Sequence, residues 1–305
     1  YRIEGMIYCE SKSGIRYCRK ENDTPVYWGE MDFDNHYFSN KKVYSDKIAK
    51  LGIRCNQKSS GQVISRLEDI FGLMYIDEVQ DMVGWDLELL KLLLKSKIQL
   101  TMVGDPRQTV YNTHYDSKLK KYKDGKIRDF INNDCKKLCQ IDEITLKNSY
   151  RNSAEICSLS SKLYSDFPVC ISNLTHTCEH SGIFFVRESD AQDYCKLTRP
   201  LQLRWSSQKN VISPNKVMNF GDSKGVEDQH VLIYPTTEML KWLNGHNVSL
   251  KFVTKAKLYV ALTRAMFSIG IIVENNFINK TQHIKFWDSA TSIHNSYIKS
   301  KLNFA

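Results

Sequence analysis

Two adjacent carboxylates, Asp77 and Glu78, follow an apolar run, Phe71 to Ile76, that has the length of a buried strand. In an open α/β sheet, ligands bind at the carboxyl ends of the strands. An acidic pair there suits Mg²⁺, which proteins hold through one or two carboxylates together with waters and phosphate oxygens. The second carboxylate could then orient or deprotonate an attacking water. A solvated acidic turn explains the same residues equally well on this stretch alone.

A second strand and turn follow, and they favour the chemical interpretation. Large apolar residues at three- and four-residue spacing predict a helix over 84–94, and the apolar run 98–103 predicts another buried strand. That strand ends in a polar turn with the sequence Gly104-Asp105-Pro106-Arg107-Gln108-Thr109-Val110-Tyr111. Two neighbouring strands of one sheet would therefore each end in a turn that carries functional groups.

The two turns together resemble motifs II and III of the superfamily 1 helicases of the UvrD/Rep/PcrA type. Three later stretches resemble further motifs in the same order: Ser149-Tyr150-Arg151 for motif IV, Ser223-Lys224-Gly225-Val226-Glu227 for motif V, and Tyr259-Val260-Ala261-Leu262-Thr263-Arg264-Ala265 for motif VI. The resemblance covers about Phe71 to Val273 and leaves the first seventy residues unexplained.

For the first half of the chain, the resemblance implies three roles at an ATP site. Asp77 would bind Mg²⁺, and Glu78 would activate the attacking water. Gln108 would sense the γ-phosphate and couple it to DNA. Taken alone, each of these side chains would be an ordinary surface residue, so the roles depend on the order of the motifs.

For the second half, the resemblance implies nucleotide contacts and two arginine fingers. Tyr150 would stack on adenine, Gly225 would allow close approach of the backbone, and Glu227 would contact the sugar. Arg151 and Arg264 would stabilise the transferring phosphoryl group, with Arg264 at the rim of the second domain. The planar, permanently charged guanidinium suits this task because it can bind phosphate through two hydrogen bonds.

The chain also departs from this family. It contains no G-x-x-x-x-G-K-[ST] loop to hold the β- and γ-phosphates, so we expect it to begin partway through the first domain or to have lost the loop. The interval from Arg151 to Lys224 is too short for the family's inserted 2B domain, which indicates a compact form. The tryptophan expected after motif III is missing, and Gly221 stands where motif V has a histidine.

The charge balance favours a polyanionic partner. The chain has 43 Lys and Arg residues against 34 Asp and Glu, a net charge of +9. The segment 112–135 mixes basic and aromatic residues, a composition that suits single-stranded nucleic acid. The candidate nucleic-acid contacts are His114, Tyr115, Lys120, Lys121 and Lys123. A solvated, lysine-rich loop is the alternative interpretation of this segment.

Composition places the chain among ordinary globular proteins, with 42% hydrophobic and 25% charged residues in 305. No apolar stretch is long enough to span a bilayer, so we expect no membrane association and a cytoplasmic location. The nine cysteines include no C-x-x-C pair, which is typical of reduced thiols rather than a disulfide framework.

Apolar spacing and runs predict further elements. Apolar residues on one face predict a helix over 62–71, and apolar runs predict strands over 182–186, 231–234 and 267–273. A helix that runs to about Tyr164 should have side-chain capping near Ser153 and Glu155. Another helix, over 235–243, should begin at Thr236 or Thr237.

These observations predict an α/β protein with two RecA-like domains, each built on a parallel sheet, and a nucleotide cleft between them. We place the first domain at residues 1–140, without its phosphate loop, and the second at 141–305. The implied activity is that of an ATP-dependent helicase or translocase, with ATP and Mg²⁺, acting on single-stranded or forked DNA. The rival hypothesis is a non-motor subunit that senses DNA or nucleotide and controls an OLD-family nuclease in antiviral defence, as in Gabija systems.

Overall fold

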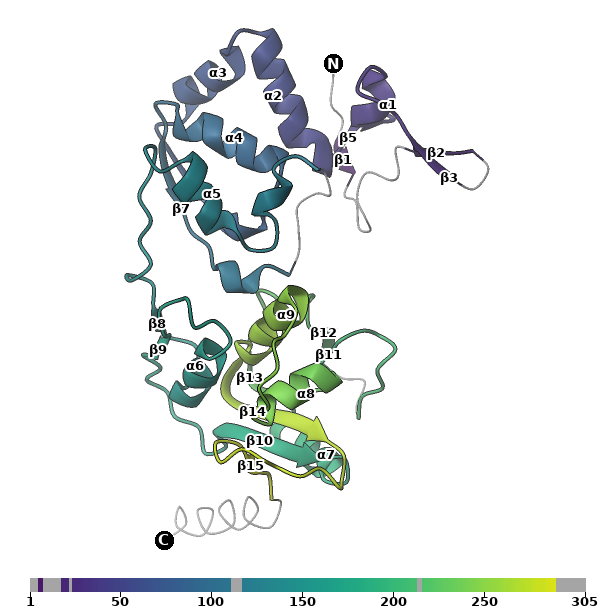
Figure 1. Ribbon diagram of the computed structural model, residues 1–305, viewed down its shortest axis with the longest axis vertical. Helices are drawn as coiled ribbons and strands as arrows, with labels where there is room; N and C mark the ends of the chain where they lie inside the picture. The colour runs from purple at the N-terminus through teal and green to yellow at the C-terminus, as the bar shows by residue number, and fades with distance from the viewer. Residues whose placement is uncertain (1–4, 8–17, 22–23, 111–116, 213–215, 289–305) are drawn as a thin grey trace, which may run out of the picture. The chain divides into compact units, whose positions relative to one another are not determined.

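In a computed structural model, the chain forms two compact units, residues 1–141 and 142–305 (Figure 1). The structure describes residues 5–7, 18–21, 24–110, 117–212 and 216–288, with side chains from Trp28 onward. Both units mix helices and strands, which confirms the predicted α/β class. The assignment of the units to RecA-like domains stays a prediction. Among the helices in these ranges, none has the length and apolar character that crossing a membrane requires.

A six-stranded parallel sheet forms the centre of the second unit (Figure 1). Its strand order is β12 (Val217–Asn219), β11 (Leu201–Arg204), β13 (Asp228–Ile233), β14 (Ala265–Val273), β10 (Gly182–Arg187) and β15 (Lys285–Phe286). Every residue of β14 is buried except the half-buried Met266. Such continuous burial is typical of a parallel strand with both faces covered. The strands predicted near 182–186, 231–234 and 267–273 are confirmed.

Helices cover both faces of this sheet, and the alternation of side chains along the strands shows which helix lies on which face. Ile269 and Ile271 of β14 belong to the main core, which also takes in residues of α6 (Ala154–Ser161), α8 (Thr237–Leu243) and α9 (Phe252–Leu262). The next residue, Ile272, points to the other face and belongs to a second cluster with Tyr194 of α7 (Ala191–Thr198). The second unit therefore encloses its own sheet.

Two helix starts in this unit were predicted from capping residues. Of Thr236 and Thr237, the two residues predicted to begin α8, Thr236 caps the helix, because its side chain accepts a hydrogen bond from the amide of Met239 at 3.4 Å. Ser153 occupies the N-cap position of α6, but its side chain makes no cap hydrogen bond. Its hydroxyl is buried, and its backbone amide donates to the carbonyl of Met266 instead. The expected side-chain cap at Ser153 is therefore wrong.

The first unit contains a parallel pair of strands, β6 (Leu73–Ile76) and β7 (Gln99–Met102), connected through α4 (Trp85–Leu94). One face of the pair packs against a cluster that includes residues of α4 and α5 (Ile127–Asp134). On the opposite face, Leu73 and Tyr75 are 45% and 71% exposed. The prediction that both strands are buried is therefore wrong for one of the two faces.

The N-terminal part of this unit holds short strands and three helices. Strands β1 (Gly5–Ile7), β5 (Lys42–Tyr44) and β4 (Phe38–Ser39) form one sheet, and β2 (Cys18–Glu21) and β3 (Thr24–Tyr27) form a hairpin. The helices are α1 (Phe33–Tyr37), α2 (Ile48–Lys58) and α3 (Gln62–Ile70). The helix predicted from Gln62 is confirmed. Helix α2 was not predicted, because its buried face is only Ala49, Lys50 and Ile53, and a lysine breaks the apolar pattern.

Candidate functional site

The turn after β6 carries the two predicted acidic residues, Asp77 and Glu78, and both are exposed. Glu78 adopts the left-handed backbone conformation, with φ at 53°, which is uncommon for a residue with a side chain. The carboxylate of Asp77 accepts a hydrogen bond from the amide of Glu78 at 2.7 Å. The side-chain amide of Gln80 donates to the carboxylate of Glu78. Glu78 is thus held by its neighbours on both sides.

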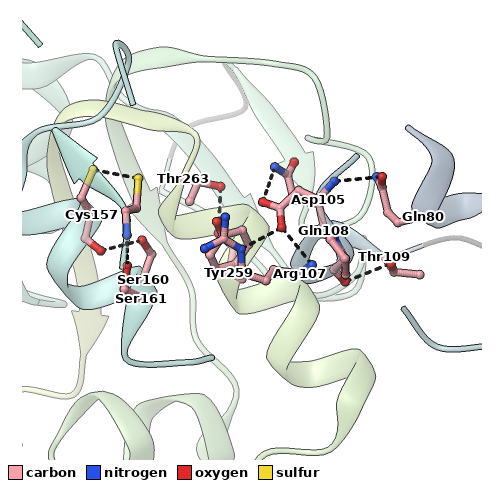
Figure 2. A network of polar contacts seen from close by, with 12 residues as sticks. Gln80, Asp105, Arg107, Gln108, Thr109, Cys157, Ser160, Ser161, Tyr259 and Thr263 are labelled. Atoms are coloured by element: carbon pink, nitrogen blue, oxygen red, sulfur yellow. Dashed lines mark hydrogen bonds and ion pairs between the residues drawn. The ribbon is translucent and has the colours of Figure 1, made fainter. Parts of the chain in front are cut away.

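Gln80 joins this turn to the turn after β7 (Figure 2). The side chain of Gln80 is 2% exposed, and its Oε1 accepts a hydrogen bond from the backbone amide of Asp105 at 3.0 Å. Its Nε2 donates to Glu78, so both the oxygen and the nitrogen of this buried side-chain amide are hydrogen-bonded. A buried polar group that is satisfied in this way fixes its partners, because breaking either bond leaves an unpaired group inside the protein.

Gly104 makes the close approach of the two turns possible. A Cβ at this position would collide with Oε1 of Gln80 and would lie 2.9 Å from Cγ1 of Val79. The backbone of Val79 also donates to the carbonyl of Val103 at 3.1 Å. The glycine of the second turn is therefore required by packing against the first turn rather than by an unusual φ angle.

Asp105 organises the second turn, which is a 3₁₀ turn over Pro106–Gln108. One carboxylate oxygen of Asp105 accepts from the amide of Arg107 at 3.1 Å and from its Nε at 2.7 Å. The other oxygen accepts from Nε2 of Gln108 at 3.1 Å (Figure 2). Hydrogen bonds therefore run without a break from Glu78 through Gln80 and Asp105 to Gln108, and they connect two of the predicted catalytic residues.

The acidic residues at this edge determine whether the predicted Mg²⁺ could be held there. No group of three or more histidine, cysteine or acidic side chains that could hold a metal ion occurs among the described residues. Asp77 offers one exposed carboxylate at the end of a strand. That arrangement fits an ion held by a single carboxylate, with waters and substrate phosphates completing its coordination.

In the second unit, the structure brings two predicted residues together although they lie 76 positions apart. Nε of Arg151 donates to a carboxylate oxygen of Glu227 at 2.6 Å, and the side chains are 40% and 55% exposed. Arg151 lies in the loop between β8 (Asn148–Ser149) and α6, next to Tyr150, which is 73% exposed. The predicted phosphate and sugar contacts thus form an ion pair on the surface of this unit.

Asn152 anchors the loop that carries Arg151. Its side-chain Nδ2 donates to the carbonyls of Thr263 and Ala265 at 3.1 and 2.7 Å. Its Oδ1 accepts from the hydroxyl of Ser149 at 2.9 Å. Because Asn152 is buried and bonds to both neighbours of Arg264, the two loops that carry the predicted fingers are tied together.

Arg264 lies just after the last residue of α9, and it is buried with 1% of its surface exposed. Its guanidinium donates to the carbonyl of Val260 at 3.0 Å, to the carbonyl of Val226 at 3.1 Å and to the hydroxyl of Thr263 at 3.2 Å. Val226 stands between Gly225, which has φ of +82°, and Glu227. Arg264 therefore closes the C-terminal end of α9 and holds the Gly225 loop. Its role as an arginine finger stays a prediction.

The predicted nucleic-acid contacts are only partly within the described residues. His114 and Tyr115 lie outside them. Lys120 and Lys121 are exposed, and Lys123 is half-buried. The neighbouring Tyr122 is buried in the core of the first unit, so its ring is not offered to a base. Over the described residues 117–135, the lysines supply positive charge without an exposed aromatic partner.

Sequence reasoning missed three residues that position this chemistry, namely Gln80, Asp105 and Asn152. Each is a short polar residue placed within three positions of a predicted catalytic residue, which is the signal that could have identified them. Each also has a partner in another loop, from 25 to 113 positions away. The hydrogen bonds depend on how the chain folds, and spacing along the sequence does not reveal them.

Comparison with known proteins gives a partial match. A family model described as the UvrD/REP helicase N-terminal domain matches residues 17–114, which include both turns of the first unit. No curated protein sequence matches the chain.

Several solved helicase structures are similar to the chain at low identity. The arterivirus nonstructural protein 10 helicase is 17% identical over 67% of this chain and 40% of that one, with a TM-score of 0.43. A PRRSV helicase is 16% identical over 75% and 50%, with a TM-score of 0.41. The arterivirus helicase in complex with DNA is 16% identical over 66% and 40%, with a TM-score of 0.42. The chain therefore spans half or less of the length of these proteins.

Proposed function

We propose that this chain is part of a superfamily 1 DNA helicase or translocase that is driven by ATP hydrolysis. The observation that carries the proposal is the unbroken set of hydrogen bonds from Glu78 through Gln80 and Asp105 to Gln108. These residues lie within the range matched by the UvrD/REP helicase N-terminal family model. A carboxylate and an amide held in one network at the ends of two parallel strands suit a site that orients water against a phosphate.

In this proposal, Glu78 orients the attacking water and accepts its proton, because its carboxylate is exposed and Gln80 fixes its direction. Asp77 would hold Mg²⁺, which supplies charge neutralisation at the phosphates when it is bound. Gln108 would respond to the γ-phosphate, and any movement of its amide would act on Asp105, to which it is bonded.

The second unit would supply positive charge to the same reaction. Arg151 would leave Glu227 and bind the γ-phosphate, and Glu227 would then be available to the sugar. Tyr150 would stack on the base, because its ring is largely exposed. Arg264 would add charge when the two units close on the nucleotide, which lowers the barrier through interactions made chiefly in the transition state.

The proposal is tested by replacing Glu78 with Gln. Glu78→Gln keeps the shape of the side chain but removes the base, so hydrolysis should fall by roughly 10²–10⁴-fold while nucleotide binding is retained. Glu274→Gln, at an exposed position of the second unit, is the matched control and should hydrolyse ATP at the parent rate.

The assay is single-turnover ATP hydrolysis with single-stranded DNA present. It should be run on residues 1–305 and on a longer form that carries a G-x-x-x-x-G-K-[ST] loop. We expect little turnover from residues 1–305 by themselves, because that loop is not in their sequence. A Glu78→Gln variant that keeps the parent rate in the longer form would contradict the proposed role of Glu78.

One observation favours the second candidate function, a non-motor subunit that senses DNA or nucleotide. Both predicted fingers donate to acceptors of their own unit, Arg151 to Glu227 and Arg264 to backbone carbonyls. A subunit of this kind would bind ATP with Mg²⁺ but would not turn it over. Nucleotide binding without hydrolysis in the longer form, with an OLD-family nuclease responding to its addition, would favour this function over the helicase.

A further inference from the structure

We propose that Cys157 and Cys170 form a dithiol site that a peroxide oxidises reversibly to a disulfide. The two residues are thirteen positions apart, and the thiol of Cys170 donates to Sγ of Cys157 at 3.5 Å (Figure 2). A disulfide needs the sulfurs about 2 Å apart, so they have to approach by roughly 1.5 Å. We expect rotation of the two side chains to provide movement of this size without unfolding of the backbone.

Hydrogen bonds hold the backbone around each cysteine in place, so the fold itself places the two sulfurs close together. Cys157 lies inside α6. The amide of Cys170 donates to the hydroxyl of Ser161, at the end of the same helix, at 3.0 Å. The next residue, Ile171, begins β9 (Ile171–Ser172), which pairs in parallel with β8. Two further bonds hold the Cys170 segment: the amide of Ile171 donates to the carbonyl of Lys147 at 3.1 Å, and the hydroxyl of Ser172 donates to the carbonyl of Asn152, just before α6, at 2.7 Å.

The exposure of the two thiols sets the order of the reaction. Cys170 is half-buried and Cys157 is 2% exposed, so the oxidant meets Cys170 first. The thiolate of Cys170 attacks one oxygen of the peroxide, which forms a sulfenic acid and releases hydroxide. Sγ of Cys157 then attacks the Cys170 sulfur, the S–O bond breaks, and the hydroxyl leaves as water with the proton of Cys157. In sum, two thiols and one hydrogen peroxide give a disulfide and two waters, with two electrons passing to the peroxide.

A second pair of closely spaced cysteines offers a contrast. Cys135 and Cys139 are four positions apart, and the thiol of Cys139 contacts the carbonyl of Cys135 at 3.9 Å instead of its sulfur. Burial raises the pKa of the Cys135 thiol to about 11, which leaves very little thiolate at neutral pH. Spacing along the chain is thus a poor guide, and the orientation of the sulfurs distinguishes the Cys157 pair.

Oxidation would act on the loop that carries Arg151. The reduced thiol of Cys157 donates to the carbonyl of Asn152 at 3.7 Å, and a disulfide removes that donor. Asn152 in turn bonds to the carbonyls on both sides of Arg264. Hydrogen bonds through Asn152 therefore connect the dithiol site to the loops that carry Arg151 and Arg264. The chemistry of the site does not depend on the function proposed for these loops.

The test is peptide mapping of residues 1–305 after treatment with hydrogen peroxide. Cleavage after lysine and arginine places Cys157 in the peptide 152–162 and Cys170 in the peptide 163–187, so a bond between them links two separate peptides. We expect this linked pair in non-reducing mass spectrometry, and we expect dithiothreitol to release it. Its absence under conditions that oxidise the exposed Cys55 would overturn the proposal.

Two serine variants give a matched comparison, because the peptide 163–187 also contains Cys178. The linked pair should persist in Cys178→Ser and disappear in Cys170→Ser, and both positions are half-buried. A linked pair that survives in Cys170→Ser would assign the bond to Cys178 and would overturn the proposal. The Cys157→Ala variant, checked for folding by circular dichroism, should also lose the link.

Discussion

The six-stranded sheet of the second unit and the β6–β7 pair of the first differ in how their faces are covered. The strand β14 is buried along almost its whole length, with helices on both faces of its sheet. In the described part of the first unit, β6 packs one face on a helix cluster and exposes Leu73 and Tyr75 on the other. The second unit depends on apolar packing, whereas the acidic turn of the first depends on a few hydrogen bonds around Gln80. Substitutions in the sheet of the second unit should therefore act mainly on stability, whereas substitutions around Gln80 in the first unit should act mainly on chemistry.

The largest effect is expected from Arg264→Ala, which tests whether the second unit also carries chemistry. If Arg264 is an arginine finger, hydrolysis in a loop-bearing form should fall by roughly 10³-fold or more. The substitution also removes the donor from the carbonyls of Val260 and Val226, which should lower the free energy of unfolding by roughly 1–3 kcal/mol. Single-turnover hydrolysis and urea unfolding, measured on the same samples, separate the two effects.

Arg264→Lys is the control for this prediction. The ammonium keeps the charge but lacks the planar fork, so both stability and hydrolysis should recover only in part. A variant Arg264→Ala that loses stability but hydrolyses ATP at the parent rate would show that this arginine is purely structural. The second unit would then contribute stability to the protein, and the first unit would carry the chemistry.

Two glycines give the most direct comparison, because a Cβ would collide at both. At Gly270 it would lie 2.8 Å from Leu232 and 2.9 Å from Tyr194, so Gly270→Ala should lower the free energy of unfolding of the second unit by about 1–3 kcal/mol. At Gly104 it would collide with Gln80, so Gly104→Ala should disturb Glu78 and reduce hydrolysis more than it reduces stability. Thermal unfolding and single-turnover hydrolysis distinguish the two outcomes.

Gly52→Ala is the matched control for both glycines. Gly52 lies in α2, and a Cβ there meets no atom within 4 Å. Alanine favours a helix over glycine, so this variant should be as stable as the parent or slightly more stable. If Gly104→Ala behaved like Gly52→Ala in both assays, the network around Gln80 would not be what holds Glu78.

A smaller effect concerns pH and the packing of the second unit. Burial, with a contribution from His230, lowers the pKa of His180 from 6.5 to about 4. The ring of His180 stacks on Phe184 and lies edge-on to Tyr194. Because the folded state favours the neutral ring, this contribution to stability is complete above pH 6.5 and is lost as the pH falls towards 4.

The variant His180→Phe removes this titration and keeps an aromatic ring. After allowance for the partial exposure of His180, the difference in unfolding free energy between pH 7 and pH 4 should shrink by about 1 kcal/mol. Urea unfolding at several pH values measures it. An unchanged pH dependence would mean that the imidazole titrates normally in the folded unit.

The smallest effect is expected from the lysines of the first unit. Replacing Lys120, Lys121 and Lys123 together with Gln should flatten the dependence of single-stranded DNA affinity on salt, by up to about 0.7 in the logarithmic slope for each lost phosphate contact. Fluorescence anisotropy between low and moderate salt measures this slope. The matched control replaces three exposed lysines of the second unit, namely Lys162, Lys241 and Lys280. Equal flattening by both triple variants would show that net charge alone binds the DNA.

The sequence predicted three strands of the second unit, because β10, β13 and β14 contain apolar runs of strand length that are largely buried. It did not predict β11, β12 or β15, which are short, and β12 and β15 are only partly buried. The run 71–76 looks the same in the sequence, yet β6 is half exposed. An apolar run records hydrophobicity but not how many neighbours cover it. Helix α2 was not predicted, because its buried face is short and includes a charged residue. That residue is Lys50, whose ammonium lies 3.1 Å from the carboxylate of Glu30.

The residues of the candidate site were predicted from spacing and resemblance, while their arrangement was not. The spacing of the motifs selected Glu78, Gln108 and Arg264. The direction in which the Arg264 side chain turns depends on the carbonyls left open at the end of α9, which only the folded chain reveals. The same is true of Gln80, whose two partners come from different turns.

Asn152 also determines which substitutions its position can accept. Its amide nitrogen donates both hydrogens to the carbonyls of Thr263 and Ala265, and its oxygen accepts a hydrogen bond from Ser149. Aspartate has almost the same shape, but it would set an oxygen against two carbonyl oxygens, and serine has only one hydrogen to give. Glutamine has the right groups on a stem one carbon too long for a buried site. Mutational scanning should therefore find this position intolerant even of its closest chemical relatives, while its neighbour Tyr150, exposed to solvent, accepts many residues wherever folding alone is selected.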